Sequence, residues 1–212
     1  MGQKVGFVGL GRAGWNMAEN LLRGGYELAV IDADAGREHE FAASHPGVRV
    51  GLECFHDAEV SVTMLPNGHV VRRVLLEDEG GLAQRLAAGA IVIDASSSDP
   101  AGTRRLGAEL ANRGVTLVDA PVTRPVHDHI NTRRIVFMVG GPDDAVDRVL
   151  PLLEAMGERV FRVGELGNGH TVRCGRPNRP GREGTRRSDA ARSSRHSSEA
   201  AAAASASSPA VG

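Results

Sequence analysis

The sequence is poor in aromatic residues, cysteine and net charge. Aromatic residues make up 3% of its 212 residues, and the formal net charge is −1. A charge so close to zero argues against a polybasic nucleic-acid-binding protein. The two cysteines, Cys54 and Cys174, lie far apart without a recognisable spacing, so neither a disulfide framework nor a structural zinc site is indicated. We therefore expect neither a metal nor a nucleic acid among its ligands.

Long apolar runs are also missing. The sequence holds no run of about 18 apolar residues that could span a membrane. The N-terminus enters a short apolar run after four residues and then meets glycines. This is not the long apolar region and small-residue cleavage site of a signal peptide. These patterns predict a cytoplasmic protein that does not bind membranes.

The composition changes abruptly at Cys174. Residues 174–212 contain nine Ala, eight Ser and seven Arg, but no Leu, Ile, Met or Phe. The net charge of this tail is +4, so residues 1–173 carry −5. So little apolar surface cannot offset the entropy that ordering the chain would cost. We therefore predict a disordered tail over residues 174–212.

Residues 1–173 alternate short apolar runs with helical patterns. Strands are predicted at Lys4–Val8, Leu28–Ile31, Arg49–Val50, Val60–Met64, Ile91–Asp94, Thr116–Ala120, Ile135–Val139 and Arg159–Val163. Helices are predicted at Ala13–Arg23, Gly36–Ser44, His69–Leu76, Gly81–Ala88, Pro100–Arg113 and Asp143–Met156. Strands that alternate with helices favour a parallel sheet covered on both faces. The fold class is therefore α/β, a doubly wound and mostly parallel sheet.

A glycine-rich turn follows the first predicted strand and opens the first predicted helix. In the pattern G-x-G-x-x-G, the first glycine permits the tight turn, the second lets a pyrophosphate approach, and the third lets helix pack on strand. The helix N-terminus presents free N–H groups and the positive end of its dipole to the phosphates. The alternative is a glycine-rich turn that binds nothing. The residues predicted to bind a dinucleotide here are Gly9, Leu10, Gly11, Arg12, Ala13 and Gly14.

An acidic residue ends the second predicted strand. Asp32 lies eighteen residues past Gly14, where an acid commonly accepts the ribose hydroxyls of a dinucleotide and repels a 2′-phosphate. The nearest arginine, Arg37, is several positions further on. The charge therefore favours NAD over NADP as the cofactor. The alternative is that Asp32 caps the helix that follows.

Six motifs of residues 3–173 occur together in the order found in one protein family. They are VGLGRAGWNMA from Val8, MLPN from Met64, DASSSDP from Asp94, DAPVT from Asp119, MVGG from Met138 and GELGNGHTV from Gly164. With these motifs the chain resembles the β-hydroxyacid dehydrogenases. This group contains the 3-hydroxyisobutyrate dehydrogenases and tartronate semialdehyde reductases and is related to 6-phosphogluconate dehydrogenase. The resemblance implies a Rossmann-type NAD(P)-binding domain over residues 1–164 and the start of an interdomain connection over 165–173.

The resemblance also implies where ligands bind. The nicotinamide side of the cofactor is met by the loop of Leu65, Pro66 and Asn67 and by Ser96 and Ser97. The loop that begins at Asp119 touches the substrate. Residues implied there are Thr123, in place of the family's serine, and Arg124, in place of a glycine. The implied chemistry is hydride transfer between the nicotinamide and the hydroxyl-bearing carbon of a small hydroxycarboxylate.

The sequence departs from the family at the proton-transfer position. The family has a lysine there, whose pKa burial and neighbouring charges can shift toward neutrality. This chain has Arg173, and a guanidinium does not readily release its proton, although it can bind a carboxylate in a bidentate manner. Arg124 and Pro125 also replace paired glycines of the substrate loop. Arg173 is therefore the one catalytic candidate, and a poor acid or base.

The leading hypothesis is an NAD(P)-dependent oxidoreductase of the 3-hydroxyacid dehydrogenase type that is weakly active or inactive. The change in composition after Arg173 favours a truncated copy or a reading-frame change, with apolar surface left for self-association. The second hypothesis is a non-catalytic dinucleotide-binding module or a partner of a full-length relative. A third, imine reduction, uses a similar cofactor domain.

Overall fold

A computed structural model describes residues 2–77, 81–123 and 135–175. These residues belong to one unit, Met1–Asn178. Arg124 and residues 176–212 lie outside the described residues, and so does the side chain of Thr123. The predicted disorder of the tail and the domain boundaries at 164 and 173 therefore stay predictions.

The described elements alternate between strands and helices along most of the chain. In order they are β1 (Lys4–Val8), α1 (Arg12–Arg23), β2 (Glu27–Ile31), α2 (Ala35–Ser44), β3 (Arg49–Val50), η1 (Leu52–Phe55), β4 (Val60–Thr63), α3 (Gly68–Leu76), η3 (Leu82–Gln84), β5 (Ile91–Asp94), α4 (Pro100–Ala111), β6 (Thr116–Asp119), β7 (Val122–Thr123), β8 (Val136–Val139), α5 (Asp143–Met156), β9 (Arg159–Arg162) and α6 (Asn168–Arg173). The larger sheet has six parallel strands in the order β3-β2-β1-β4-β5-β6. This order confirms the predicted doubly wound α/β fold.

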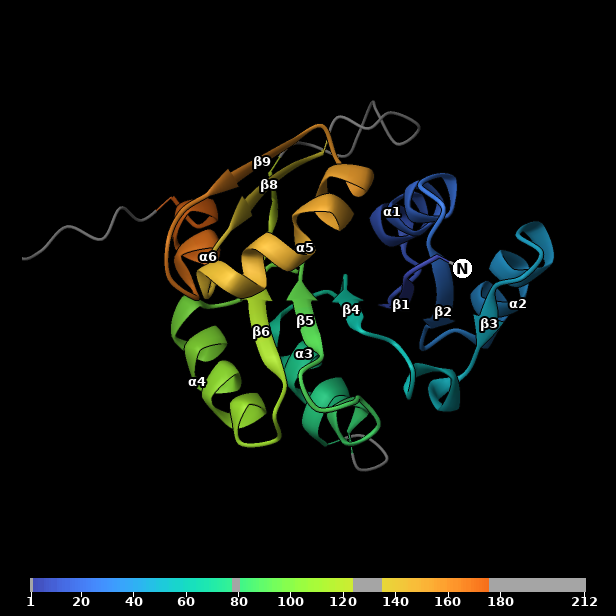
Figure 1. Ribbon diagram of the computed structural model, residues 1–212, viewed down its shortest axis with the longest axis horizontal. Coiled ribbons are helices and arrows are strands. Elements are labelled where there is room, and N and C mark those ends of the chain that lie inside the picture. The colour runs from blue at the N-terminus through green and yellow to red at the C-terminus, as the bar shows by residue number, and fades with distance from the viewer. Residues whose placement is uncertain (1, 78–80, 124–134, 176–212) are drawn as a thin grey trace, which may run out of the picture. The chain divides into compact units, whose positions relative to one another are not determined.

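Several strands of the larger sheet send alternate side chains to two separate cores. In β5, Ile91 and Ile93 join the core that α1, α2 and α5 cover, whereas Val92 joins the core beneath α3 and α4 (Figure 1). Strands buried on both faces read as near-continuous apolar runs, which is why they were recognisable in the sequence. Because both faces are covered, ligands are left with the carboxyl-terminal edge of the sheet.

The strands after residue 120 leave the parallel sheet. They form a second sheet of three strands in the order β7-β8-β9, with β7 antiparallel and β9 parallel to β8. An antiparallel bridge between Asp119 and Gly140 joins the end of β6 to the residue after β8. The last helix of the described residues, α6, packs against β8 and against the end of β6.

Most predicted elements are confirmed to within two residues, and one prediction is wrong. The expected helix over residues 81–88 is only the short 3-10 helix η3, and residues 85–89 that follow it form turns and a bend. Gly81, with φ +80°, lies before the helical turn and not within it. Conversely, the helix predicted over Asp143–Met156 is observed with the same bounds, although Pro151 lies inside it.

Candidate functional site

The three glycines of the first turn have different surroundings. Gly9 has φ +99°, and a Cβ there would collide with the carbonyl oxygen of Met64. A Cβ on Gly14 would overlap the carbonyl oxygen of Gly9, so α1 packs directly on the end of β1. A Cβ on Gly11 would meet only Arg37 Nη1, at 3.9 Å, among the described residues. The turn is therefore closed toward the protein at two glycines and open at the one where a pyrophosphate would approach.

The first turn of α1 is arranged to receive an anion. Gly11 is its N-cap, and within the described residues no side chain caps it and no acid lies in it. Arg12 is exposed and Ala13 partly buried in this turn. Uncapped N–H groups and the positive end of the helix dipole both favour a phosphate.

Asp32 directly follows β2 and holds the glycine turn. Its Oδ2 accepts the backbone N–H of Leu10 at 2.6 Å, and its Oδ1 accepts that of Asp34 at 2.9 Å. The alternative that Asp32 caps the next helix is wrong, because Asp34 is the N-cap of α2 and accepts the N–H of Gly36 at 2.9 Å. Asp32 thus stands at the edge of the sheet where a ribose is held in this kind of fold.

Two cavities flank the glycine turn. One of about 590 Å³ lies on the Asp32 side, and another of about 420 Å³ contains Gly11, Arg12 and Trp15. Ligand pockets of proteins commonly measure about 300–1,000 Å³ and are mostly apolar. The first cavity has this size, and aliphatic side chains supply much of its lining. They are Val8, Ile31, Leu52, Leu65, Val70 and Val74.

The loop between β4 and α3 is tied to the end of β5. The backbone N–H of Leu65 donates to Ser96 Oγ at 2.9 Å, and Ser96 is 1% exposed. Asn67 caps α3 through its Oδ1, which accepts two backbone N–H groups at 3.0 and 3.1 Å. Pro66 is exposed between them. The structure therefore brings together the two segments predicted to meet the nicotinamide, which come from distant motifs.

Arg173 contacts the second of the predicted serines. Its Nε and Nη2 donate to Ser97 Oγ at 3.2 and 3.1 Å, and both residues are exposed. Arg173 ends α6, so the residue at the family's lysine position lies beside the predicted nicotinamide side. A guanidinium retains its proton in proteins, so at this place it can orient a neighbour or attract an anion.

A buried group of two carboxylates and an imidazole lies beneath these residues. Asp94 and Asp119 are register partners at the ends of β5 and β6, and His170 of α6 lies against both. His170 Nε2 is 3.8 Å from Asp94 Oδ2, and Nδ1 is 3.4 Å from Asp119 Oδ2. Burial raises the pKa of Asp119, against the opposing effect of the backbone N–H donors of Gly167 and His170. All three side chains are at most 1% exposed.

The sequence reasoning did not single out these three residues. A signal was present, because two predicted strands each end in Asp and neighbouring parallel strands end at the same edge of a sheet. The contact with His170 carried no such signal, since it depends on where α6 docks.

The substrate loop is the least described part of the predicted site. Thr123 ends β7, where its backbone pairs with Val136 of β8. The side chain of Thr123 and the whole of Arg124 lie outside the described residues. Both assignments stay predictions.

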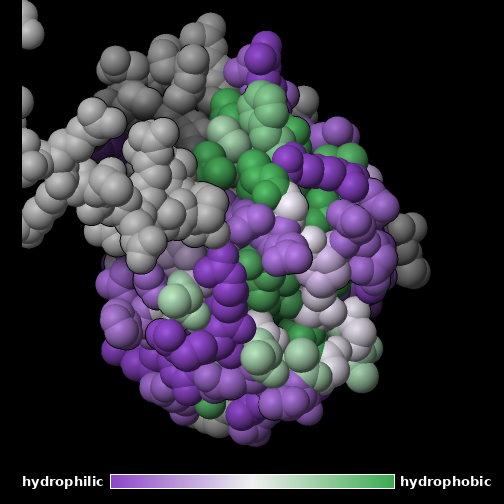
Figure 2. Space-filling model, turned by 90° about the vertical axis from the view of Figure 1, so that its left-hand side faces the viewer, coloured by the Kyte–Doolittle hydropathy of each residue, from purple (hydrophilic) through white to green (hydrophobic). Residues whose placement is uncertain are grey.

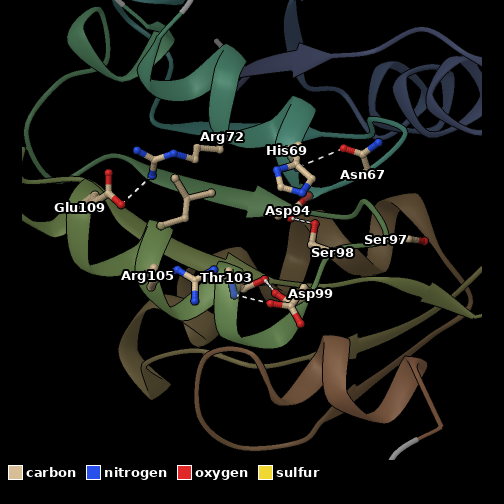
Figure 3. A pocket seen from close by; sticks show the side chains of 13 residues that line it. Asn67, His69, Arg72, Asp94, Ser97, Ser98, Asp99, Thr103, Arg105 and Glu109 are labelled. Carbon is tan, nitrogen blue, oxygen red and sulfur yellow. Dashed lines mark hydrogen bonds and ion pairs between the residues drawn. The ribbon is translucent and has the colours of Figure 1, made fainter.

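A third cavity of about 660 Å³ opens between α3 and α4 (Figure 3). It borders the predicted nicotinamide side through Asn67 and Ser97, and its lining also includes the ion pair between Arg72 Nη1 and Glu109 Oε1 at 2.6 Å. Within the described ranges, no group of three or more His, Cys, Asp or Glu is placed to hold a metal ion. No helix of that part of the chain has the length and apolar character needed to cross a membrane.

The strand order, the open glycine turn and the acid at the end of β2 define a Rossmann-type dinucleotide-binding domain. Residues 4–164 match the family model described as the NAD binding domain of 6-phosphogluconate dehydrogenase, and the chain belongs to that family. This match confirms the resemblance inferred from the six motifs.

Curated relatives of the chain are oxidoreductases by name. It is 37% identical over 171 residues to 3-sulfolactaldehyde reductase of Escherichia coli K12, covering 80% of this chain and 56% of that protein. It is 36% identical over 173 residues to 3-hydroxyisobutyrate dehydrogenase of Pseudomonas aeruginosa, again covering 80% and 56%. The chain therefore spans little more than half the length of these relatives.

Solved structures agree with this assignment. The 3-hydroxyisobutyrate dehydrogenase of Mycobacterium tuberculosis with L-serine is similar at a TM-score of 0.74 and 30% identity, over 82% of this chain and 59% of that one. An imine reductase variant of Myxococcus stipitatus in complex with NAD+ has a TM-score of 0.73 at 18% identity, over 82% and 60%. The second likeness shows the shared fold alone.

Proposed function

We propose that this chain binds NAD, in preference to NADP, along the carboxyl edge of its larger sheet. The observation that carries the proposal is the contrast among the three glycines. Gly9 and Gly14 leave no room for a side chain, while Gly11 faces open space above an uncapped helix turn. Backbone packing requires Gly9 and Gly14, whereas the approach of a ligand explains Gly11.

The residues present fit this cofactor from end to end. The cavity beside Asp32 suits the adenosine of NAD. Asp32 would accept hydrogen bonds from its ribose hydroxyls and would repel the 2′-phosphate of NADP. The first turn of α1 would hold the pyrophosphate. Ser97 and the loop of Leu65–Asn67 would border the nicotinamide, as the family resemblance implies. When bound, the nicotinamide supplies or accepts the hydride.

The reaction we infer is the interconversion of a small 3-hydroxy acid and its semialdehyde, at a low rate. The names of the relatives support this substrate class. Removal of the hydroxyl proton requires a group that alternates between protonation states near neutral pH. Arg173 occupies that position, and a guanidinium is a poor acid or base, so Arg173 would hold a substrate carboxylate without transferring the proton.

The alternative function is a non-catalytic dinucleotide-binding module that acts as a partner of a longer relative. The hydrogen bonds from Arg173 to Ser97 favour this alternative, because they hold a guanidinium, which is a poor acid or base, at the family's proton-transfer position. Under this alternative the cofactor binds with similar affinity but no turnover occurs.

Titration of the purified chain with NAD and NADP tests cofactor binding. At about 100 times its dissociation constant, NAD should raise the melting temperature by about 5–10 °C, while NADP at the same concentration raises it less. Adenosine alone, which lacks the phosphates, is the matched ligand control and should produce a much smaller shift. If neither dinucleotide changes the melting temperature or gives heat on calorimetric titration, the proposed function is wrong.

Oxidation of NADH with small semialdehydes, followed by absorbance, separates the two functions. We expect slow turnover in the wild-type chain and faster turnover in Arg173→Lys, which restores a group able to exchange its proton. Binding without turnover in both proteins would favour the non-catalytic module. Rapid wild-type turnover would contradict the role assigned to Arg173.

We further propose that the chain self-associates. The side of the unit where Figure 1 places α4 and α6 bears hydrophobic patches among hydrophilic residues (Figure 2). Among the described residues, Phe161 of β9 and Val172 of α6 are large apolar side chains that stand 45% and 49% exposed, and association of two chains would remove such apolar surface from water. Light scattering coupled to gel filtration should give a mass above that of a monomer, and a monodisperse monomer at high concentration would oppose this proposal.

A further inference from the structure

The short helix α6 is fixed to the body by one buried carboxylate. Asp119 Oδ1 accepts the backbone N–H of Gly167 at 2.7 Å, and Oδ2 accepts that of His170 at 2.8 Å. Gly169 lies between them, and a Cβ there would come within 2.7 Å of Asp119 Oδ2. Asp119 thus caps the helix, and the absence of a side chain at Gly169 allows the helix to approach it.

This docking directs the His170 ring toward the segment after β5. Its Nε2 lies 3.1 Å from the carbonyl oxygen of Ser96, and its Nδ1 lies 2.9 Å from Thr103 Oγ1. A carbonyl only accepts hydrogen bonds, so Nε2 must carry a hydrogen and donate it. His170 is fully buried, so water does not compete for this bond.

Ser96 connects His170 to the loop between β4 and α3. While its carbonyl oxygen accepts from His170, its hydroxyl oxygen accepts the backbone N–H of Leu65 at 2.9 Å. The histidine is therefore connected through one residue to the loop between β4 and α3. Both predicted nicotinamide-side segments depend on the same serine.

Arg173, one helical turn after His170, makes a similar contact with the residue that follows Ser96. It lies three residues after His170, so both side chains project from the same face of α6. The buried His170 contacts Ser96, and the exposed Arg173 contacts Ser97. One face of α6 thus contacts two consecutive residues.

We propose that His170 is a positioning residue for the nicotinamide half of the cofactor site, with Arg173 as its exposed counterpart. His170 acts through Ser96 and Leu65 and does not itself touch the ligand. This role rests on the proposed dinucleotide binding. It predicts that α6 matters to the nicotinamide half and not to the adenosine and pyrophosphate half, which β1, α1 and Asp32 form.

Comparison of NADH with ADP-ribose tests this division, because ADP-ribose has every part of the dinucleotide except the nicotinamide. In the full chain, His170→Leu should weaken NADH binding about tenfold and ADP-ribose binding by less than about twofold, both measured by calorimetry. His170→Gln, whose amide can still donate to the Ser96 carbonyl, should recover part of the loss. The matched control is His56→Leu at an exposed histidine, which should change neither.

Arg173→Ala gives a second test that does not perturb the buried group. Because Arg173 is exposed, the variant should fold like the wild type and again weaken NADH more than ADP-ribose. Equal weakening of both ligands by His170→Leu and Arg173→Ala would overturn the positioning role. A wild-type chain that binds NADH and ADP-ribose equally well would also overturn it, because the nicotinamide would then contribute nothing. A wild-type chain that does not bind ADP-ribose would instead contradict the proposed function.

Discussion

The Asp119 carboxylate accepts the backbone N–H of His170 at 2.8 Å, although 51 residues separate them in the chain. Its other oxygen accepts the N–H of Gly167 at 2.7 Å. Both oxygens are buried, and burial raises the pKa of the Asp119 carboxyl. An acid at the end of a parallel strand thus serves as the cap of a helix from the far end of the described chain.

Asp119→Asn should destabilise the protein by about 1–3 kcal/mol, measured by chemical denaturation. The amide keeps one accepting oxygen, but its NH₂ group faces a backbone N–H, which leaves two buried donors opposed. Glu154→Gln removes a carboxylate charge at an exposed position of α5 outside its first turn and should change stability by less than about 0.5 kcal/mol. Equal effects of the two substitutions would show that the two hydrogen bonds contribute little.

Much of the fold could be predicted because its signals are local. Apolar runs gave the parallel strands, and the caps supplied by Asn67 and Asp99 begin α3 and α4 within one residue of the predicted starts. The 3-10 helix η3 could not be predicted, because its leucine and alanine spacing also fits a regular helix, and the spacing does not show that the helical turn ends after Gln84.

The candidate site was predictable where a single turn supplies it. The glycine turn and Asp32 are close in sequence and follow strands that the pattern identifies. The bond from Leu65 to Ser96 and the contact of Arg173 with Ser97 span 31 and 76 residues. Such contacts depend on the docking of α6 and on the register between β4 and β5, which residue spacing does not determine. Only the family resemblance placed these residues near one another.

Gly11→Ala should separate binding from folding. The φ of Gly11 is −63°, and a Cβ meets nothing closer than 3.9 Å among the described residues, so only the poorer capping by alanine should lower the melting temperature, by about 4 °C at most. The methyl group projects where the pyrophosphate would lie, and NAD binding should weaken by tenfold or more. Gly14→Ala is the contrasting variant, because its Cβ overlaps the Gly9 carbonyl and should lower stability itself. Unchanged NAD affinity in Gly11→Ala would place the pyrophosphate elsewhere.

Asp32→Ser should shift cofactor preference toward NADP. The serine loses the charge that repels a 2′-phosphate and one of the two carboxylate oxygens that hold Leu10 and Asp34. NAD affinity should fall about tenfold while NADP affinity falls less, as measured by parallel titrations. Asp34→Ser removes the neighbouring charge yet preserves a good helix cap, so its ratio of NAD to NADP affinity should stay near that of the wild type. A shift of equal size in Asp34→Ser would show that general charge, and not Asp32, sets the preference.

Asp57 should make stability pH-dependent in acid. Hydrogen bonds from Lys4, at 2.7 Å, and from Arg49, at 3.0 and 3.2 Å, hold the pKa of the Asp57 carboxyl well below its ordinary value of 3.8. When the pKa of a carboxyl is lower in the folded protein than in the unfolded chain, the group stabilises the fold fully at pH values above its unfolded pKa. This contribution to the free energy of unfolding is lost as the pH falls toward the folded pKa. The wild type should therefore exceed Asp57→Asn in stability at pH 7, by up to about 1 kcal/mol, and this difference should shrink below about pH 4.

Urea denaturation of both proteins between pH 3 and pH 7 measures this difference. Glu158→Gln, at an exposed residue between α5 and β9, controls for loss of a carboxylate as such and should show little pH dependence relative to the wild type. A constant gap between the wild type and Asp57→Asn across the range would mean that the ion pairs do not stabilise the fold.

From the long separations within the buried group of Asp94, Asp119 and His170 we expect a particular order of assembly. The bonds from His170 to Thr103 and Ser96 close loops of 67 and 74 residues, while β1 and α1 adjoin one another in the chain. Contacts that close long loops cost more chain entropy than contacts between neighbouring elements, so we expect them to form late in folding. The phosphate-binding turn can therefore form early, whereas the nicotinamide side becomes complete only after the final described helix has docked. Amide hydrogen exchange should show the same order in reverse, with α6 opening before β1 and α1.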